Sequence, residues 1–306
     1  MDLTYGPEYN AFRAEVKAFV AANIDEQPKP GDGPRSPAVR AWQAKLIANG
    51  YHSRTIPEAY GGYGAEPDII RSRIIAEEFS AAQMNTGFSG QGISMLTPVL
   101  LELGTEAQKQ QFIRKTIHGE LIWCQGYSEP GAGSDLASLT TKAELDGDEW
   151  VINGQKVWTS GAHYSDYGIL LVRTDPKVPK HKGLTMFIVN MKQAGVEVRP
   201  IHQASGGREF NEVYFTDVRI PDKDRLGDVG AGWKVALVTL MNERLAVGGS
   251  PGPDWGEIMD YARDHGSLSD QAFREKLADW YVAAQGYKLT KFRTQTALSR
   301  GQTPGP

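Results

Sequence analysis

The stretch "SEPGAGSD", residues 128–135, is the most informative segment of this sequence. It combines one proline and two glycines with two serine hydroxyls, so it is too irregular for a helix and too polar for a core strand. A second polar stretch, "INGQKVWTSGA" at 152–162, follows it and contains a tryptophan. We interpret the first stretch as a loop whose backbone another molecule approaches closely.

Upstream of this loop, the sequence has the periodicity and the end signals of helices. Ser36 and Pro37 are a typical N-cap and first helical residue. Thr105 and Gln108 have the spacing of a capping box at the start of another helix. We therefore predict an all-α N-terminal domain over residues 1–120.

Residues 121–229 change to a period of two with turn signals. Asp146-Gly147 and Asn153-Gly154 are both favoured in tight hairpin turns, because those positions need positive φ. The region is predicted to be an antiparallel β-sheet domain, either a sandwich or a barrel. Further strands are expected in four stretches rich in β-branched and aromatic residues: "YGILLVRTD" (167–175), "GLTMFIVNM" (183–191), "GVEVRPI" (195–201) and "EVYFTDVRI" (212–220).

Helical spacing returns after residue 229, in 234–249 and again in 271–301. The chain ends in "QTPGP", and a Pro/Gly ending after an amphipathic helix usually leads to another element. We therefore expect the natural protein to continue, and we interpret 230–306 as an incomplete C-terminal helical bundle. The predicted fold class is α+β and multidomain.

Composition argues against several functional classes. A formal net charge of −4 provides no basic field for nucleic acid. Apolar runs such as "ILLV" at 169–172 are too short to span a bilayer, and the N-terminus lacks a signal-peptide core, so we expect a cytoplasmic protein. Cys124 is the single cysteine, which excludes an internal disulfide framework, and the six histidines lack metal-ligand spacing, so no metal site is predicted.

Four stretches in order resemble the acyl-CoA dehydrogenase family, in its bacterial branch, and the resemblance extends over nearly the whole chain. One such motif would be weak, whereas the ordered set is specific. The resemblance implies FAD in a cleft between the domains. It also implies oxidation of an acyl-CoA to the trans-2-enoyl-CoA, with electrons passed to an electron-transfer flavoprotein. The stretches are "WCQGYSEPGAGSD" (123–135), "NGQKVWTSGA" (153–162), "FNEVYFTDVRIPDKDRLG" (210–227) and "MNERLA" (241–246).

The resemblance also assigns ligand contacts to the two polar stretches. A flat, amphipathic ring needs an aromatic neighbour and a few well-placed donors, which these stretches contain. From the residues alone, Trp158 could instead be a core aromatic and Ser128 a turn hydroxyl. The residues assigned to FAD are Gln125, Tyr127, Ser128, Trp158, Thr159 and Ser160, and Ser134 is assigned to coenzyme A.

Acyl-CoA oxidation in this family removes a proton α to the thioester and a hydride from the β carbon, which passes to the flavin. Relatives that place the catalytic carboxylate in the first helix after the sheet domain carry it in a Glu-Arg motif, and Glu243 matches that position. Arg244 points about 100° away on a helix, and we assign it to substrate binding or to bracing the helix. The alternatives are that Glu243 is a solvated helix carboxylate and that the base lies in a later segment.

The sequence leaves the completeness of the site, the oligomeric state and the function open to alternatives. The late family segment that closes the flavin site is not found before Pro306, so either the chain is a fragment or another subunit completes the site. We expect a homotetramer or a heterotetramer. A non-catalytic structural subunit of a heteromeric dehydrogenase, or a flavin oxidase or monooxygenase of the same fold, are the alternative functions. The resemblance to the bacterial branch suggests an acyl group bulkier than butyryl.

Overall fold

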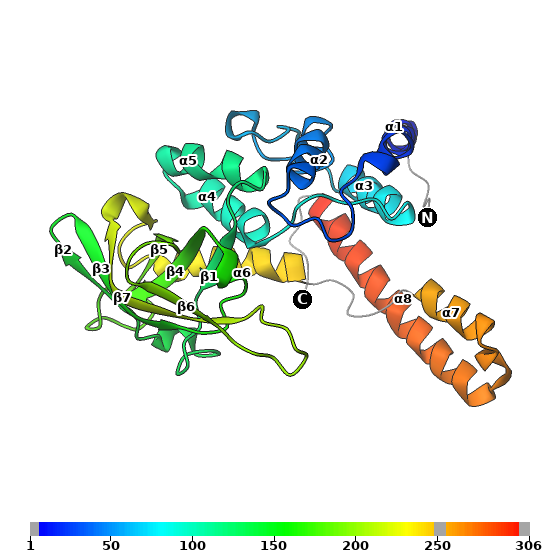
Figure 1. The fold of residues 1–306 in the computed structure, drawn as a ribbon. Coiled ribbons are helices and arrows are strands. Elements are labelled where there is room, and N and C mark those ends of the chain that lie inside the picture. The colour runs from blue at the N-terminus through cyan, green and yellow to red at the C-terminus, as the bar shows by residue number, and fades with distance from the viewer. Residues whose placement is uncertain (1–5, 248–254, 300–306) are drawn as a thin grey trace. The chain divides into compact units, whose positions relative to one another are not determined.

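The computed structural model describes residues 6–247 and 255–299, which divide into two compact units (Figure 1). One unit contains residues 6–21, 67–82 and 255–299, and the other contains 22–66 and 83–247. Within the described residues no helix is both long and apolar enough to cross a membrane.

The smaller unit is built from helices. Asp68 caps α3 by accepting a hydrogen bond from the backbone N–H of Arg71 at 2.9 Å, as expected for an N-cap. Phe19 and Phe79 stack with ring centroids 6.3 Å apart and join the first two helices of the unit. Its helices are α1 (Pro7–Asn23), α3 (Ile69–Ala81), α7 (Trp255–Asp264) and α8 (Gln271–Ser299).

The larger unit begins with helices whose ends follow the sequence signals. Ser36 accepts a hydrogen bond from Val39 N–H at 3.2 Å, and the capping box of Thr105 and Gln108 is formed in both directions. These predictions are confirmed. The helices are α2 (Pro37–Ala48), a π-helical turn η3 (Gly92–Leu96), α4 (Thr97–Leu103) and α5 (Glu106–Ile117).

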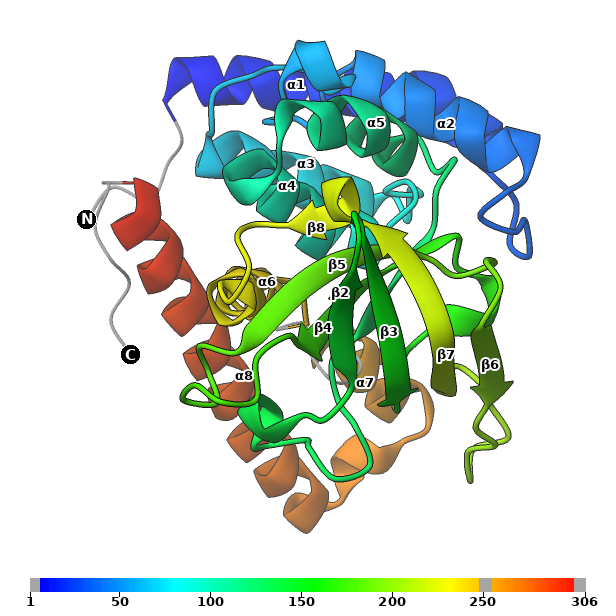
Figure 2. The same ribbon diagram turned by 90° about the vertical axis from the view of Figure 1, so that its left-hand side faces the viewer.

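Eight strands of the larger unit form one sheet, in the order β6-β7-β3-β2-β4-β5-β8, with β1 paired to β4. Figure 2 shows β2, β3, β7 and β6 side by side. The pairs are antiparallel except where β4 meets β1 and the start of β2, so the predicted antiparallel domain is confirmed as mostly antiparallel. The strands are β1 (Trp123–Gly126), β2 (Lys142–Asp146), β3 (Glu149–Lys156), β4 (Tyr167–Arg173), β5 (Leu184–Asn190), β6 (Val196–Pro200), β7 (Asn211–Pro221) and β8 (Arg225–Leu226).

Both faces of the central strands are buried. On β4, Ile169 and Leu171 join a core shared with the helices, while Leu170 and Val172 join a second core among the strands. Trp150 of β3 meets a phenylalanine of β5 across this second core, with ring centroids 5.4 Å apart. The sheet therefore curls on itself, and burial on both faces explains why β4 is a continuous apolar run rather than an alternating one.

One turn prediction is wrong. Asp146-Gly147 does begin the turn between β2 and β3, with Gly147 at φ +68°. Asn153-Gly154 instead lies inside β3, where the register against β7 shifts. A Cβ on Gly154 would come within 2.5 Å of Thr141 Oγ1, so glycine is needed there for close approach inside a bulged strand and not for a hairpin.

Helix α6 (Gly232–Val247) packs against β4 and β5 and also contacts η3 and α4 (Figure 1). Gly232 starts this helix directly on the sheet, because a Cβ there would lie 2.6 Å from Thr185 N. The helix thus connects the sheet with the helical layer of the same unit. It carries Glu243, the predicted base.

Candidate active site

The 128–135 loop is a short, closed turn that follows β1 after one intervening residue, Tyr127. Glu129 and Ala132 exchange backbone hydrogen bonds of 2.9 and 3.0 Å, which fixes the Pro-Gly pair between them. The Ser128 carbonyl accepts a hydrogen bond from Val157 N–H at 2.9 Å. The two polar stretches that the sequence singles out are therefore neighbours in the folded chain.

A buried ion pair fastens the same loop to β3. Lys156 Nζ donates to Glu129 at 2.9 Å and to the Tyr127 carbonyl at 3.0 Å. Burial alone would raise the pKa of Glu129, but the charge of Lys156 and the donors of Thr140 and Thr141 bring it down to about 2. Sequence reasoning missed this pair. The one sign of this ion pair in the local sequence is that Lys156 takes an inward-facing position in a strand whose residues alternate between buried and more exposed.

Trp158 follows β3 and is not a core residue. Its side chain is 59% exposed, and its backbone has φ +60°, a region that bulky residues rarely adopt. The ring edge packs on Phe210, with centroids 6.0 Å apart. The alternative of a core aromatic is therefore wrong, because much of the indole is open to solvent.

Thr159, beside this tryptophan, is held by its backbone. Its N–H donates to the Asn211 carbonyl at 3.0 Å, and its own carbonyl accepts from Asn211 Nδ2 at 2.8 Å. The Thr159 hydroxyl oxygen is buried without a hydrogen-bond partner. A buried polar atom of this kind costs free energy until something pairs with it.

Tyr127 and Glu243, predicted as a flavin contact and as the base, interact electrostatically. Tyr127 is 4% exposed, and its buried hydroxyl lies beside the Thr239 hydroxyl without a hydrogen bond of normal geometry. Burial raises the pKa of Tyr127, the nearby Thr239 hydroxyl opposes the shift, and the Glu243 carboxylate raises the pKa further. Glu243 itself is half-buried. The side chain of Arg244 lies outside the described residues.

The remaining predicted residues occupy different surroundings. Gln125 is half-buried on β1, and Ser128 is half-buried at the start of the loop. Ser134 is exposed on the far side of the loop, beside Asp135, whose carboxylate accepts from Lys180 at 2.6 Å. Ser160 lines a pocket that sequence reasoning did not find.

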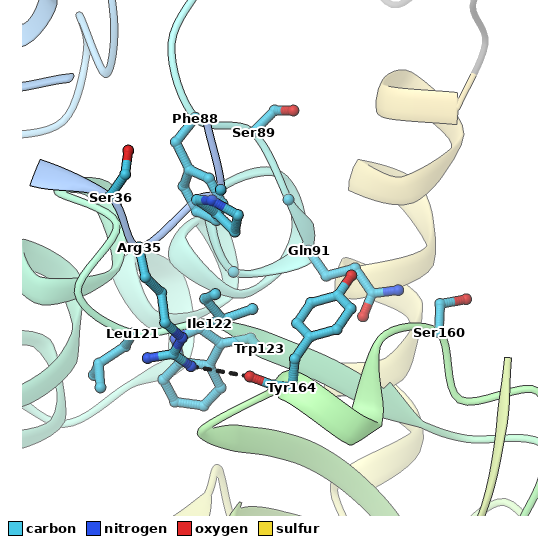
Figure 3. A pocket seen from close by; sticks show the side chains of 14 residues that line it. Arg35, Ser36, Phe88, Ser89, Gln91, Leu121, Ile122, Trp123, Ser160 and Tyr164 are labelled. Atoms are coloured by element: carbon cyan, nitrogen blue, oxygen red, sulfur yellow. Dashed lines mark hydrogen bonds between the residues drawn. The ribbon is translucent and has the colours of Figure 1, made fainter. Parts of the chain in front are cut away.

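This pocket has a volume of about 680 Å³ and lies within the larger unit (Figure 3). Its lining comes from 33–36, 88–92 and 121–123, together with Ser160 and Tyr164. Arg35 bridges two of these segments, because its guanidinium donates to the Tyr164 carbonyl and to Asp166, both at 2.9 Å. Glycines at positions 33, 90 and 92 are the sequence feature that could have indicated a close approach of another molecule to the backbone at this pocket.

Comparisons with known proteins agree with this architecture. Residues 6–120 match the acyl-CoA dehydrogenase N-terminal domain, and 124–218 match the middle domain. The acyl-CoA dehydrogenase IpdE1 of Mycobacterium tuberculosis (strain ATCC 25618 / H37Rv) is 40% identical over 276 residues, which cover 88% of this chain and 70% of that protein.

Two solved structures show the same fold. The "Tcur3481-Tcur3483 steroid ACAD" superposes with a TM-score of 0.77 at 30% identity, over 99% of this chain and 79% of that chain. The ChsE4-ChsE5 complex from Mycobacterium tuberculosis gives 0.76 at 30% identity, over 98% and 78%. The fold thus defines an architecture of the acyl-CoA dehydrogenase type. The chain belongs to the acyl-CoA dehydrogenase family of oxidoreductases, whose members are flavoproteins.

The groups around the two polar stretches fit a flavin. An exposed indole in a constrained backbone offers a face for a flat ring. The unpaired hydroxyls of Thr159 and Tyr127 offer hydrogen bonds that the protein leaves unused. These three features on neighbouring segments match the chemistry of an amphipathic ring.

Proposed function

We propose that this protein oxidises an acyl-CoA to the trans-2-enoyl-CoA, with FAD as cofactor and Glu243 as the base. The observation that supports this assignment is the position of Glu243 on helix α6, which packs against β4, β5 and η3, together with the electrostatic effect of its carboxylate on Tyr127. The helix that carries Glu243 also packs against η3, which directly follows the pocket residue Gln91. The proposal therefore places the Glu243 carboxylate beside the cofactor and the pocket.

Each part of the site has a separate task in this proposal. Glu243 takes the proton α to the thioester, and a substrate that fills the pocket excludes water from around the carboxylate. When bound, FAD supplies the acceptor for the hydride that leaves the β carbon. Exposed Ser134 contacts coenzyme A, and Arg244 contributes to substrate binding. The residues that would hold FAD are Gln125, Tyr127, Ser128, Trp158, Thr159 and Ser160.

The acyl group occupies the pocket beside Ser160 in this proposal. A volume of about 680 Å³ lies within the usual range for whole small-molecule sites, so there is room for more than a short straight chain. The printed name of one structural neighbour describes a steroid enzyme, which agrees with a bulky acyl class. We further propose an electron-transfer flavoprotein as the electron acceptor and a tetrameric assembly, with like or unlike subunits.

The test of this function is the flavin absorbance of FAD-supplemented protein during anaerobic addition of acyl-CoAs of increasing bulk. Wild-type protein is expected to lose its flavin band with at least one of them. Glu243→Gln should bind FAD and acyl-CoA but reduce flavin at least ~10²-fold more slowly. The control is Glu144→Gln, an exposed carboxylate on β2. Equal rates of flavin reduction for Glu243→Gln and wild type would show that another group is the base.

A further inference from the structure

We propose that Glu129 and Lys156 are positioning residues for the cofactor site. Their buried ion pair sets where the backbone of residues 127–129 and the indole of Trp158 lie relative to each other. This inference rests on the proposed function, because it takes these two segments as the ones that hold FAD. Neither member of the pair contacts the cofactor itself, and both act through the segments that do.

Lys156 and its neighbour hold the entry of the 128–135 loop at consecutive points. The fully buried Nζ of Lys156 donates to the Tyr127 carbonyl at 3.0 Å and to Glu129 Oε1 at 2.9 Å. The carbonyl of Ser128, between these two residues, accepts from Val157 N–H at 2.9 Å. Three consecutive residues of the loop entry are therefore bonded to Lys156 and to the residue after it.

The Glu129 carboxylate is also bonded to the segment that leads into β2. Its Oε2 accepts from the Thr140 N–H at 2.7 Å and from the Thr140 hydroxyl at 2.8 Å, and its Oε1 accepts from Thr141 N–H at 2.8 Å. Thr141 in turn donates through its hydroxyl to the Gln155 carbonyl on β3 at 3.3 Å. Both carboxylate oxygens are thus held by the sheet, which fixes the position of the loop.

Trp158 needs fixed neighbours because its backbone is strained. Its φ of +60° is rare for a bulky residue, and such conformations persist only where the surroundings over-determine them. Val157 on one side is bonded to Ser128, and Thr159 on the other side is bonded to Asn211. The bond on the Val157 side depends on the position of the loop, which the ion pair holds.

Stability alone is a weak reason for a buried ion pair. Taking two charges out of water is costly, and replacing such a pair by uncharged residues of similar size is often neutral or stabilising. A buried pair with several directional hydrogen bonds can instead impose one geometry. The geometry that Glu129 and Lys156 impose is that of the segments proposed to hold FAD. We therefore expect FAD binding to depend on the pair more strongly than folding does.

The experiment uses the double variant Lys156→Met with Glu129→Gln, because it leaves neither charge buried without a partner. One measurement is the dissociation constant of FAD by equilibrium dialysis. The other is the fluorine NMR line of Trp158 in FAD-free protein labelled with fluorotryptophan, identified among the seven tryptophans with Trp158→Phe. We expect the double variant to be folded, to show a shifted or split Trp158 line and to bind FAD about 10- to 100-fold more weakly than wild type.

Ile152→Ala is the matched control, since Ile152 is fully buried on the same strand but belongs to the second core. It should lose stability while it keeps the wild-type Trp158 line and an FAD affinity within about twofold of wild type. A double variant with the wild-type line, or with FAD affinity within about twofold of wild type, would overturn the positioning role, and so would an equal loss of affinity in Ile152→Ala. Wild-type protein that binds no FAD would refute the proposed cofactor, and the Trp158 line alone would then decide whether the pair positions this segment.

Discussion

Lys156 Nζ lies 2.9 Å from Glu129 Oε1, and the two side chains are 0% and 4% exposed. This pair joins strand β3, which leads to Trp158, to the 128–135 loop. Lys156 also donates to the carbonyl of Tyr127. The buried ammonium group of Lys156 thus holds together the two segments proposed to bind FAD, the one that contains Tyr127 and the one that leads to Trp158.

Removing one member of this pair should be costly, because the other charge stays buried without a partner. We expect Lys156→Met to lower the free energy of unfolding by about 3–5 kcal/mol. The double variant Lys156→Met with Glu129→Gln should regain part of the loss, since glutamine carries no charge and its one amide oxygen can still accept from Thr140, although the Thr141 N–H then loses its acceptor. Urea unfolding of the three proteins measures this. A double variant as unstable as Lys156→Met would show that the uncompensated charge is not the cause.

The same pair predicts an acid sensitivity. The pKa of Glu129 is about 2 in the folded protein against an ordinary value of 4.5. A carboxyl group whose pKa is lower in the folded protein stabilises the fold at pH values above its unfolded pKa, and this stabilisation is lost as the pH falls. The contribution of about 3 kcal/mol therefore disappears between about pH 4.5 and pH 2. Urea unfolding across this range should show the stability gap between wild type and Glu129→Gln shrinking towards acid pH. A gap that stays constant would contradict the assignment.

The fold could be predicted wherever local chemistry determines it. The caps at Ser36 and Thr105 act within one helical turn, and strands β4 and β5 carry their own apolar pattern. The parallel pairing of β1 with β4 depends on partners far apart in the chain, which no local pattern encodes. Asn153-Gly154 misled the turn prediction because a bulge can use glycine as a hairpin does.

The site was predictable only in part. Motif residues such as Trp158 and Glu243 carry signals in the sequence, although their roles stay predictions. The unpaired state of the Thr159 hydroxyl carries no such signal, because being buried without a partner is a property of the folded surroundings. The Glu129–Lys156 pair is of the same kind, since only the sheet brings the two side chains together.

Trp158→Ala tests the proposed stacking on FAD. The exposed ring contributes little to the core, so the stability of the FAD-free protein should change by less than about 1 kcal/mol. FAD affinity should fall about 10-fold or more, because the aromatic contact is lost. Equilibrium dialysis against FAD, with Trp158→Phe as the conservative variant, measures this. An unchanged affinity and flavin spectrum in the alanine variant would rule out the stacking role.

Tyr127→Phe separates a hydroxyl kept for a ligand from one that is simply buried. The hydroxyl lies beside the Thr239 hydroxyl but makes no hydrogen bond of normal geometry, so its removal should leave the FAD-free protein equally stable or more stable, by up to about 1 kcal/mol. If the hydroxyl serves the cofactor or the neighbouring carboxylate, FAD affinity should fall or the pH profile of flavin reduction should shift. Thermal unfolding without FAD and titration with FAD provide the two measurements.

Thr116→Val is the control, because its hydroxyl already donates to the Phe112 carbonyl and accepts from Trp123, so its loss should destabilise the protein. A stabilised Tyr127→Phe protein with unaltered FAD affinity and pH profile would show that the hydroxyl serves neither group.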